Sequence, residues 1–415
     1  MLKTLKKTVL KIPFALAIVL LSGWLIVHNW QHRSIFHEHY TFTAEESKKF
    51  KNFSEVFYVH GLNAWFQNNS DVAAYFFRQA VFKNVFYIDA WLRLAQAEIA
   101  LANPDKAKSI LKFSDRLTGN VYRWKWRQTL LAYELDMGEI VLRNINFLID
   151  RRKMVQDAFQ LLDTYFSRNA SGVVHALGLN NLVPYLDWLM RWGRVDDTDI
   201  AWQKIVESEI LDKDIHLKYI DFLVSKKRIH TAANIWRSYV GTEEITNSGF
   251  EKEPSNRGFG WRYTPNRKNK WAIRRNMSEV VDGEFSLKIT FEGKENISFA
   301  HLYQIVPIDQ LAPYRLVYNW RSRDISTDQG PFIEIYGYDC KGFYKSGPLM
   351  LGNHDWQEQA IEFIVPEGCQ AIVVRLRRRA SHRFDSKIEG VLWLDGFKLV
   401  KREKNGQKDP DLVIN

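Results

Sequence analysis

The side chains best suited to bind a ligand are arginines and aromatic residues in the last third of the chain. In the run 372–377, alternation along a strand would place Arg375 and Arg377 on one face and the aliphatic side chains on the other. Arg321, in another run of strand-like period, could join that face. The segment 261–275, interpreted as a loop, adds further candidates: Trp261, Tyr263, Trp271 and Arg275.

Aromatic faces stack on sugar rings, and the guanidinium fork of arginine matches a carboxylate. These residues therefore predict a polysaccharide ligand, and an acidic one. The alternative is that Arg375 and Arg377 pair with acids such as Glu334 on a neighbouring strand and form a solvated face.

Catalysis has no comparable set of residues. The sequence contains neither G-x-S-x-G nor H-E-x-x-H, and its histidines are scattered. Asp197-Thr198-Asp199 matches the D-x-D pattern with which nucleotide-sugar transferases hold a divalent cation. It precedes a helical run, where Asp and Thr serve as caps, and no strand–helix alternation supplies a nucleotide fold. We expect a non-catalytic protein, with an anchored glycosyltransferase or glycosidase as the alternative.

The two cysteines exclude a disulfide-rich scaffold and a structural zinc site made of cysteines. Cys340 follows the strand-like run 332–338 and Cys369 precedes the run 371–376. If these runs are antiparallel neighbours, the two residues meet and can form a disulfide. Two separate thiols are the alternative.

The elements that would hold these residues are short strands that begin where a helical period stops, near residue 245. Runs of period two lie at 287–291, 316–320, 332–338, 357–364, 371–377 and 391–399. Strands this short and numerous predict an all-β antiparallel sandwich over 245–401, followed by a polar tail, 402–415.

The motifs of this region, in their order, resemble the carbohydrate-binding modules with a galactose-binding-like jelly roll. They are N-x-G-F-E at 247–251, G-x-x-S-L-K-I-T-F at 283–291, L-x-Q-x-V-P at 302–307, Y-R-L at 314–316, Asp355-Trp356-Gln357, and L-W-L-D-G-F-K-L at 392–399. The resemblance implies a jelly roll that binds glycans.

The same resemblance implies a structural calcium ion, because the Glu of the family's opening motif and an Asp of its last strand often help to hold one. Here these residues would be Glu251 and Asp395, two hard carboxylates from the two ends of the domain. Gly396 stands where a second Asp is frequent, so a capping or ion-pair role is the alternative. No other cofactor is expected.

Ahead of the strands, residues 41–243 form a helical stretch with internal self-similarity. Phe57, Gly61, Ala73 and Phe77 recur 34 residues later as Trp91, Ala95, Ala107 and Leu111. Helix pairs with small residues at this period resemble a degenerate tetratricopeptide-repeat array, an all-α solenoid. The sequence predicts either five or six helix pairs, because the period fails between 150 and 182. Such arrays usually bind a protein partner and catalyse nothing.

The chain begins with a short lysine-bearing tail, 1–11, and an apolar segment, 12–30. The segment 12–27 has no charge, and positive charge precedes it at Lys3, Lys6, Lys7 and Lys11. These features predict a single-pass transmembrane anchor in the cytoplasmic (inner) membrane, with the N-terminus in the cytoplasm and the later domains periplasmic or extracellular. A cleaved signal peptide is the alternative, although small residues for cleavage are missing.

The net charge of +10 is modest for 415 residues and comes in part from the lysine tail, so no nucleic-acid partner is expected. The combined prediction is an anchored, non-catalytic scaffold that binds an envelope protein through its helices and a glycan through its sandwich. Exopolysaccharide assembly or export would use such a protein. The alternative is a pure protein–protein scaffold of the cell envelope without glycan binding.

Overall fold

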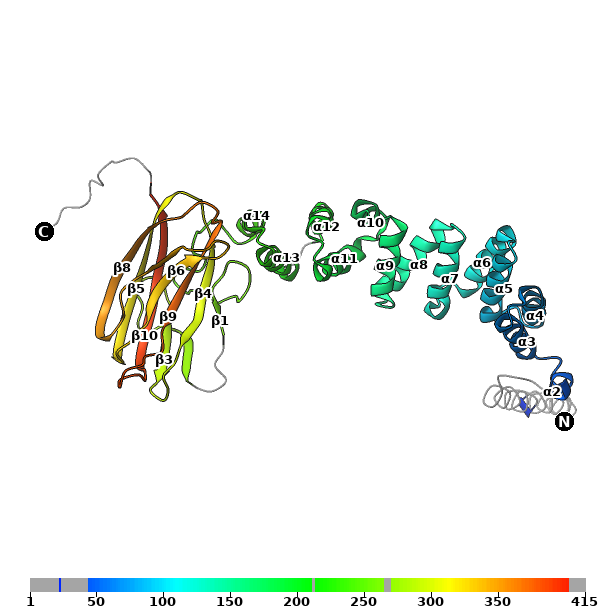
Figure 1. The fold of residues 1–415 in the computed structure, drawn as a ribbon, viewed down its shortest axis with the longest axis horizontal. Coiled ribbons are helices and arrows are strands. Elements are labelled where there is room, and N and C mark those ends of the chain that lie inside the picture. The colour runs from blue at the N-terminus through cyan, green and yellow to red at the C-terminus, as the bar shows by residue number, and fades with distance from the viewer. Residues whose placement is uncertain (1–21, 24–43, 211–212, 265–269, 403–415) are drawn as a thin grey trace, which may run out of the picture. The chain divides into compact units, whose positions relative to one another are not determined.

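The computed structural model describes residues 22–23, 44–210, 213–264 and 270–402. Helices come first in the chain and strands follow (Figure 1). The chain divides into two compact units, Met1–Trp188 and Leu189–Asn415. The last helices therefore share a compact unit with the strands. The sequence predicts the boundary between the helical and strand domains at 243–245.

The predicted localisation in the cytoplasmic membrane is corrected by the structure. In the part of the chain that the structure describes, no helix is both long enough and apolar enough to cross a bilayer. Apart from Ser22 and Gly23, the residues of the predicted anchor, 12–30, lie outside the described residues, as do the tails 1–11 and 403–415.

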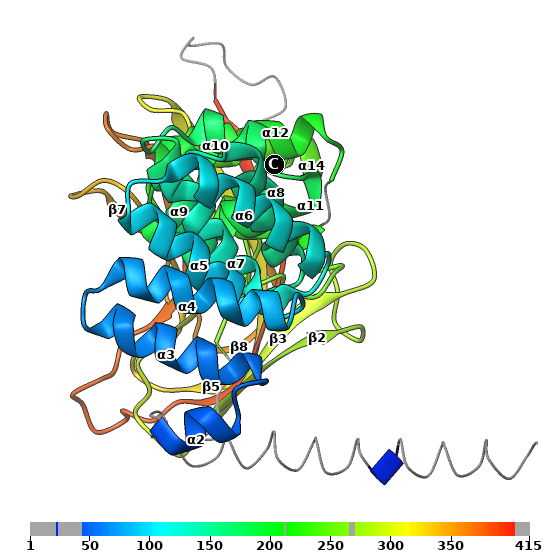
Figure 2. The ribbon, with the colours of Figure 1, turned by 90° about the vertical axis from the view of Figure 1, so that its right-hand side faces the viewer.

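The helices of the first unit follow a short α2 (Ala44–Lys49) and form antiparallel pairs. Their bounds are α3 (Ser54–Phe66), α4 (Ser70–Lys83), α5 (Ile88–Ala100), α6 (Pro104–Thr118), α7 (Tyr122–Glu134), α8 (Gly138–Asp150), α9 (Val155–Tyr165), α10 (Ala170–Ala176) and α11 (Leu179–Trp192), whose last residues enter the second unit. Figures 1 and 2 show α3 and α4 side by side. Local signals set several starts: the Asn69 side chain accepts from the Val72 N–H, and Pro104 opens α6.

The 34-residue recurrence corresponds to real packing. Helices α3, α5 and α7 begin 34 residues apart. A Cβ atom on Gly61 would lie 2.6 Å from the ring of Phe77, so glycine is what allows α3 and α4 to approach this closely. Ala73, Ala95 and Ala107 are completely buried at the equivalent places.

The region left open by the sequence contains a shortened pair. Helix α9 begins 33 residues after α7, but α10 has only seven residues, so α11 follows early. The described residues from α3 onward therefore contain twelve helices, and the last two of them, α13 and α14, pack together.

The second unit holds the end of α11, then α12 (Val195–Glu207), α13 (Lys213–Ser225), α14 (Ile229–Tyr239) and the sandwich. Contacts explain why α14 belongs with the strands. The Trp236 indole N–H donates to the Thr246 hydroxyl at 3.2 Å, and its ring meets Phe259 edge-on. A Cβ on Gly258 would lie 2.2 Å from the Trp236 ring, so the backbone lies directly against the indole.

The strands form two five-stranded antiparallel sheets, seen as two layers in Figure 1. Sheet A has the order β1 (Arg262–Tyr263), β4 (Phe299–Pro307), β9 (Ala371–Arg378), β6 (Phe332–Gly337), β7 (Tyr344–Ser346). Sheet B has the order β2 (Trp271–Asn276), β3 (Ser286–Glu292), β10 (Glu389–Lys401), β5 (Pro313–Ser326), β8 (Gly352–Ile364). The predicted sandwich is present, and its inner faces form one core.

The cysteine pair lies where the two strand-like runs were expected to meet. Strands β6 and β9 are antiparallel neighbours, with Gly337 opposite Ile372. Cys340 and Cys369 lie just beyond this end and form a disulfide with 5.1 Å between their Cα atoms. The disulfide therefore joins the end of β6 to the start of β9, two inner strands of sheet A.

Candidate functional site

The outer face of sheet A gathers aromatic and charged side chains through its strand register. Arg262 of β1 lies opposite Tyr303 of β4, and Tyr303 lies opposite Arg375 of β9. Arg375 in turn lies opposite Glu334 of β6. Because alternate residues of each strand point inward to the core, these four side chains share the outer face.

A pocket of about 760 Å³ lies over this face. Its floor belongs to sheet A and the following turn, and one wall belongs to α13. The lining residues are Asp221, Val224, Ser225, Arg262, Ala300, Tyr303, Ile305, Tyr336, Tyr338, Val373 and Arg375. We call it the sheet A pocket. Its volume is within the range of about 300–1,000 Å³ that is usual for small-molecule sites.

Arg375 is held by an ion pair inside the sheet. Its Nε donates to Glu334 Oε1 at 2.6 Å, and Glu334 is only 3% exposed. The guanidinium also lies over the Tyr336 ring, 4.6 Å from its centroid. The structure thus contains the ion pair with Glu334 that the sequence left open as the alternative to a free arginine. The charge of Arg375 is compensated.

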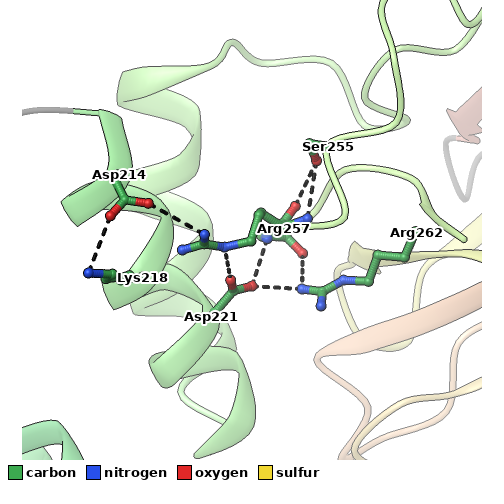
Figure 3. Close-up of polar contacts among 7 residues, drawn as sticks. Asp214, Lys218, Asp221, Ser255, Arg257 and Arg262 are labelled. Atoms are coloured by element: carbon green, nitrogen blue, oxygen red, sulfur yellow. Dashed lines mark hydrogen bonds and ion pairs between the residues drawn. The ribbon is translucent and has the colours of Figure 1, made fainter. Parts of the chain in front are cut away.

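Arg262 is held in the same way by the helical wall. Its Nη2 donates to Asp221 of α13 at 2.8 Å and to the Gly258 carbonyl at 2.8 Å (Figure 3). Asp221 also accepts from Arg257 Nε at 2.5 Å. Both arginines of the pocket are therefore ion-paired, and Arg262 shares Asp221 with Arg257, which does not line the pocket.

Tyr336 and Tyr338 keep their protons under ordinary conditions. Burial raises the pKa of Tyr336, and the nearby Arg375 opposes this only in part. Burial likewise raises the pKa of Tyr338, with Arg262 opposing. The Tyr338 hydroxyl donates to the Val224 carbonyl of α13 at 3.3 Å. The pocket therefore offers neutral hydroxyls and ring faces beside two compensated guanidiniums.

Several residues proposed from the sequence lie elsewhere. Trp261 is only 1% exposed and packs in the core between Phe250 and Phe397, so it cannot meet a ligand. Arg321 is on β5 in sheet B, where it pairs with Glu279 and Asp355. The segment 261–275 is not one loop, since β1 and β2 begin and end it.

The remaining candidates flank the pocket or lie on the other sheet. Arg377, two residues after Arg375 on β9, donates to the Phe299 carbonyl at 3.3 Å and does not line the pocket. Trp271 of β2 stacks on His301 with 4.4 Å between ring centroids. Tyr263 packs partly against the core, and Arg275 donates to the Phe250 carbonyl at 2.8 Å.

Sequence reasoning missed most of the pocket. The sequence prediction did not include Tyr303, Tyr336 or Tyr338. The alternation in 299–307 and 332–338 could have found them, because it puts these tyrosines on the other face of the strand from buried residues such as Leu302 and Ile335. The residues of α13 carried no signal, because their approach to sheet A is a long-range contact.

The proposed calcium residues do come together. A Cβ on Gly249 would lie 3.5 Å from Asp395 Oδ1 and 3.6 Å from Glu251 Oε1. Burial raises the pKa of Asp395, and the charge of Glu251 raises it further. Two such carboxylates have the oxygen chemistry of a Ca²⁺ site. Backbone N–H groups already donate to both carboxylates, however, so calcium binding stays a prediction.

The D-x-D triplet is used inside the helical region. All three residues lie in α12, near its start. Asp197 accepts from Arg194 at 2.6 Å, and Asp199 accepts from the Tyr219 hydroxyl at 2.6 Å. Asp199 therefore joins α12 to α13, whereas Asp197 pairs with the residue that precedes its own helix.

No protein-family model matches the chain, and no curated protein matches it. Among solved structures, it is similar to the carbohydrate-binding module TmCBM61 in complex with beta-1,4-galactotriose (19% identity, TM-score 0.28, covering 39% of this chain and 100% of that one). A "Family 16 Carbohydrate Binding Module-2" is similar at 17% identity and a TM-score of 0.28, covering 38% of this chain and 99% of the other.

A third similar structure is a cyclase from Fischerella sp. TAU in complex with 4-(1H-indol-3-yl)butan-2-one. It is 16% identical, with a TM-score of 0.29, and the match covers 39% of this chain and 96% of the cyclase. Likenesses of this extent fall on the C-terminal strands and carry no conclusion about function.

Proposed function

We propose that this chain is a non-catalytic glycan-binding scaffold, with the glycan held in the sheet A pocket. The observation that carries the proposal is the lining of that pocket by three tyrosines, Tyr303, Tyr336 and Tyr338, beside Arg262 and Arg375. Aromatic faces pack on the C–H faces of sugars, and fixed polar groups orient the hydroxyls. The charge-assisted N–H donors of the arginines suit sugar oxygens.

In this proposal the helices bind a protein partner. The recurring small residues, such as Gly61 and Ala95, support a tetratricopeptide-like array, and stacked helix pairs offer an extended surface for a partner. A chain that joins a protein to a glycan suits exopolysaccharide assembly or export, which is the role we favour.

One observation favours the second candidate, a scaffold that binds no glycan. Helix α13 lies over part of sheet A, and both arginines of the pocket are already paired. If the outer face of sheet A only packs against α13, the sandwich would cap the last helices and bind no glycan.

Isothermal titration of the purified chain separates the two candidates. The neutral probes are β-1,4-galactotriose, cellotriose and xylotriose, and the acidic probe is trigalacturonic acid. The glycan proposal expects at least one probe to bind. The variant Tyr336→Ala should weaken that binding about tenfold, since an aromatic contact is worth about 0.5–1.5 kcal/mol beyond its buried area.

The matched control is Tyr344→Ala. Tyr344 lies opposite Tyr336 on the neighbouring strand but does not line the pocket. The control should stay within about twofold of the unaltered chain, because most alanine replacements outside a binding pocket cost little. Absence of binding by every probe would favour the scaffold without glycan.

A further inference from the structure

We infer that helix α13 is part of the sugar-binding site and that the pocket it completes selects a neutral sugar over an acidic one. The inference rests on the proposed function and names its ligand class. It also makes the binding unit larger than the sandwich, because one wall comes from the helical region.

Three residues of α13 line the pocket: Asp221, Val224 and Ser225. Their spacing of three and four places them on one face of the helix. Ser225 is the last residue of α13 and is exposed, so its side chain borders open space in the pocket. Val224 is buried, and its carbonyl accepts from the Tyr338 hydroxyl of the floor.

The helix is fixed to the sandwich by contacts that need no ligand. Asp221 accepts from the Gly258 backbone N–H at 2.8 Å as well as from Arg257 and Arg262. Arg257 also reaches Asp214, about two turns before Asp221 on the same face of α13, at 3.5 Å (Figure 3). A wall held by four polar contacts is a built part of the site.

Each arginine that lines the pocket already has a carboxylate partner. Arg262 is balanced by Asp221, and Arg375 is balanced by Glu334, which is nearly fully buried. A sugar carboxylate entering the pocket would lose water, would find both lining guanidiniums already paired, and would approach Asp221. Neutral hydroxyls can accept from the guanidinium N–H groups and donate to the carboxylates. On this argument we assign a neutral sugar to the pocket in place of the acidic ligand expected from the sequence.

The first test is steric and compares two serines that have the same local environment at a helix end. Ser225 and Ser238 each lie at or near a helix end, are exposed, and donate to the carbonyl three residues before, at 2.6 and 2.8 Å. Only Ser225 lines the pocket. Ser225→Trp should weaken binding of the best neutral probe by about tenfold or more, while Ser238→Trp should stay within about twofold.

The second test is electrostatic and uses two aspartates that each pair with an arginine. Asp221→Asn leaves Arg262 uncompensated and should shift the ratio of trigalacturonic acid to neutral affinity by about tenfold toward the acid. The control Asp196→Asn removes a carboxylate of α12 that pairs with Arg228 outside the pocket, and it should leave the ratio unchanged. Circular dichroism spectra of all variants establish that they fold.

The outcomes separate this inference from the proposed function. If the chain binds a neutral probe and Tyr336→Ala weakens it, but Ser225→Trp does not, the helix is not part of the site and only this inference falls. If the unaltered chain binds trigalacturonic acid about tenfold more tightly than every neutral probe, the assigned ligand class is wrong. If no probe binds, the proposed function fails and this inference fails with it.

Discussion

Replacing Arg378 by methionine should destabilise the sandwich strongly. Arg378 ends β9 on the core side and is 0% exposed. Burial lowers the pKa of its guanidinium, with Asp328 opposing. The guanidinium donates to five acceptors that belong to separate loops at one end of the two sheets: Asn296, Ile297, Thr327, Gln329 and Ser386.

The expected loss of stability is about 3–5 kcal/mol, because Arg378→Met leaves five acceptors without their donor and each buried acceptor that stays unsatisfied costs about 1–3 kcal/mol. Summing five bonds at about 1.5–3 kcal/mol each would overestimate it, because the orphaned acceptors regain water as the loops relax. Methionine keeps the length and the apolar stem of arginine, so lost packing contributes little.

The control is Arg379→Met, one residue further on. Arg379 is exposed, lies 5.6 Å over the Phe332 ring and donates to the Tyr344 hydroxyl at 3.1 Å. Its replacement should cost below about 1 kcal/mol. Because the chain has two compact units, one global melt would not define a single free energy.

Hydrogen exchange read by mass spectrometry on peptides of β9 and β10 measures the opening of the sandwich alone. If Arg378→Met and Arg379→Met reduce the protection of these peptides equally, the buried arginine does not hold the loops and the reasoning is refuted.

Three further predictions concern the sandwich. Chelator should lower its melting temperature through Glu251 and Asp395, and Asp395→Asn should abolish the effect; a melt that chelator leaves unchanged contradicts calcium binding. Acidification from pH 7.5 to about pH 5.5 should destabilise the sandwich in part through His301. Burial first and Arg377 second lower the pKa of folded His301 below the ordinary 6.5, so the unfolded chain takes up the proton first. His301→Gln should remove this part of the dependence of stability on pH, and the same dependence in both proteins would exclude His301 as its source. Replacing Cys340 and Cys369 by serine should cost about 3.6 kcal/mol, the loop entropy for a separation of 29 residues, and hydrogen exchange of the β9 peptides that does not change would show that the disulfide adds nothing.

Strand positions and the meeting of the cysteines were predictable, because alternation is a local property of the sequence. The run 371–377 alternates cleanly, and β9 spans Ala371–Arg378. Arg378 itself was missed, since a charged residue at a core-facing position conflicts with the usual burial of arginine. Its partners come from distant loops, which no local pattern reveals.

The site was predicted only in part, because sheet membership is not local. Arg321 and Arg375 look alike in sequence, yet β5 pairs with β10 and β8 while β9 pairs with β4 and β6. These pairings put the two arginines on different sheets. Trp261 looked like a sugar-stacking residue, but its contacts with Phe250 and Phe397 make it part of the core.

The helical wall could not have been found from the sequence. Asp221 and Arg262 are 41 residues apart, and their ion pair depends on how α13 docks on the strands. The period of the helices predicts which residues pack between helices, such as Gly61 with Phe77, and does not predict which helix meets a sheet.

The central claim is that the sheet A pocket and α13 together hold a neutral sugar. A crystal structure of the chain with the neutral trisaccharide that binds most tightly tests it most directly. We predict the sugar over Tyr303 and Tyr336, within hydrogen-bonding distance of Arg262 or Arg375 and in contact with Ser225. A sugar bound on the outer face of sheet B, with the sheet A pocket empty, would contradict the account.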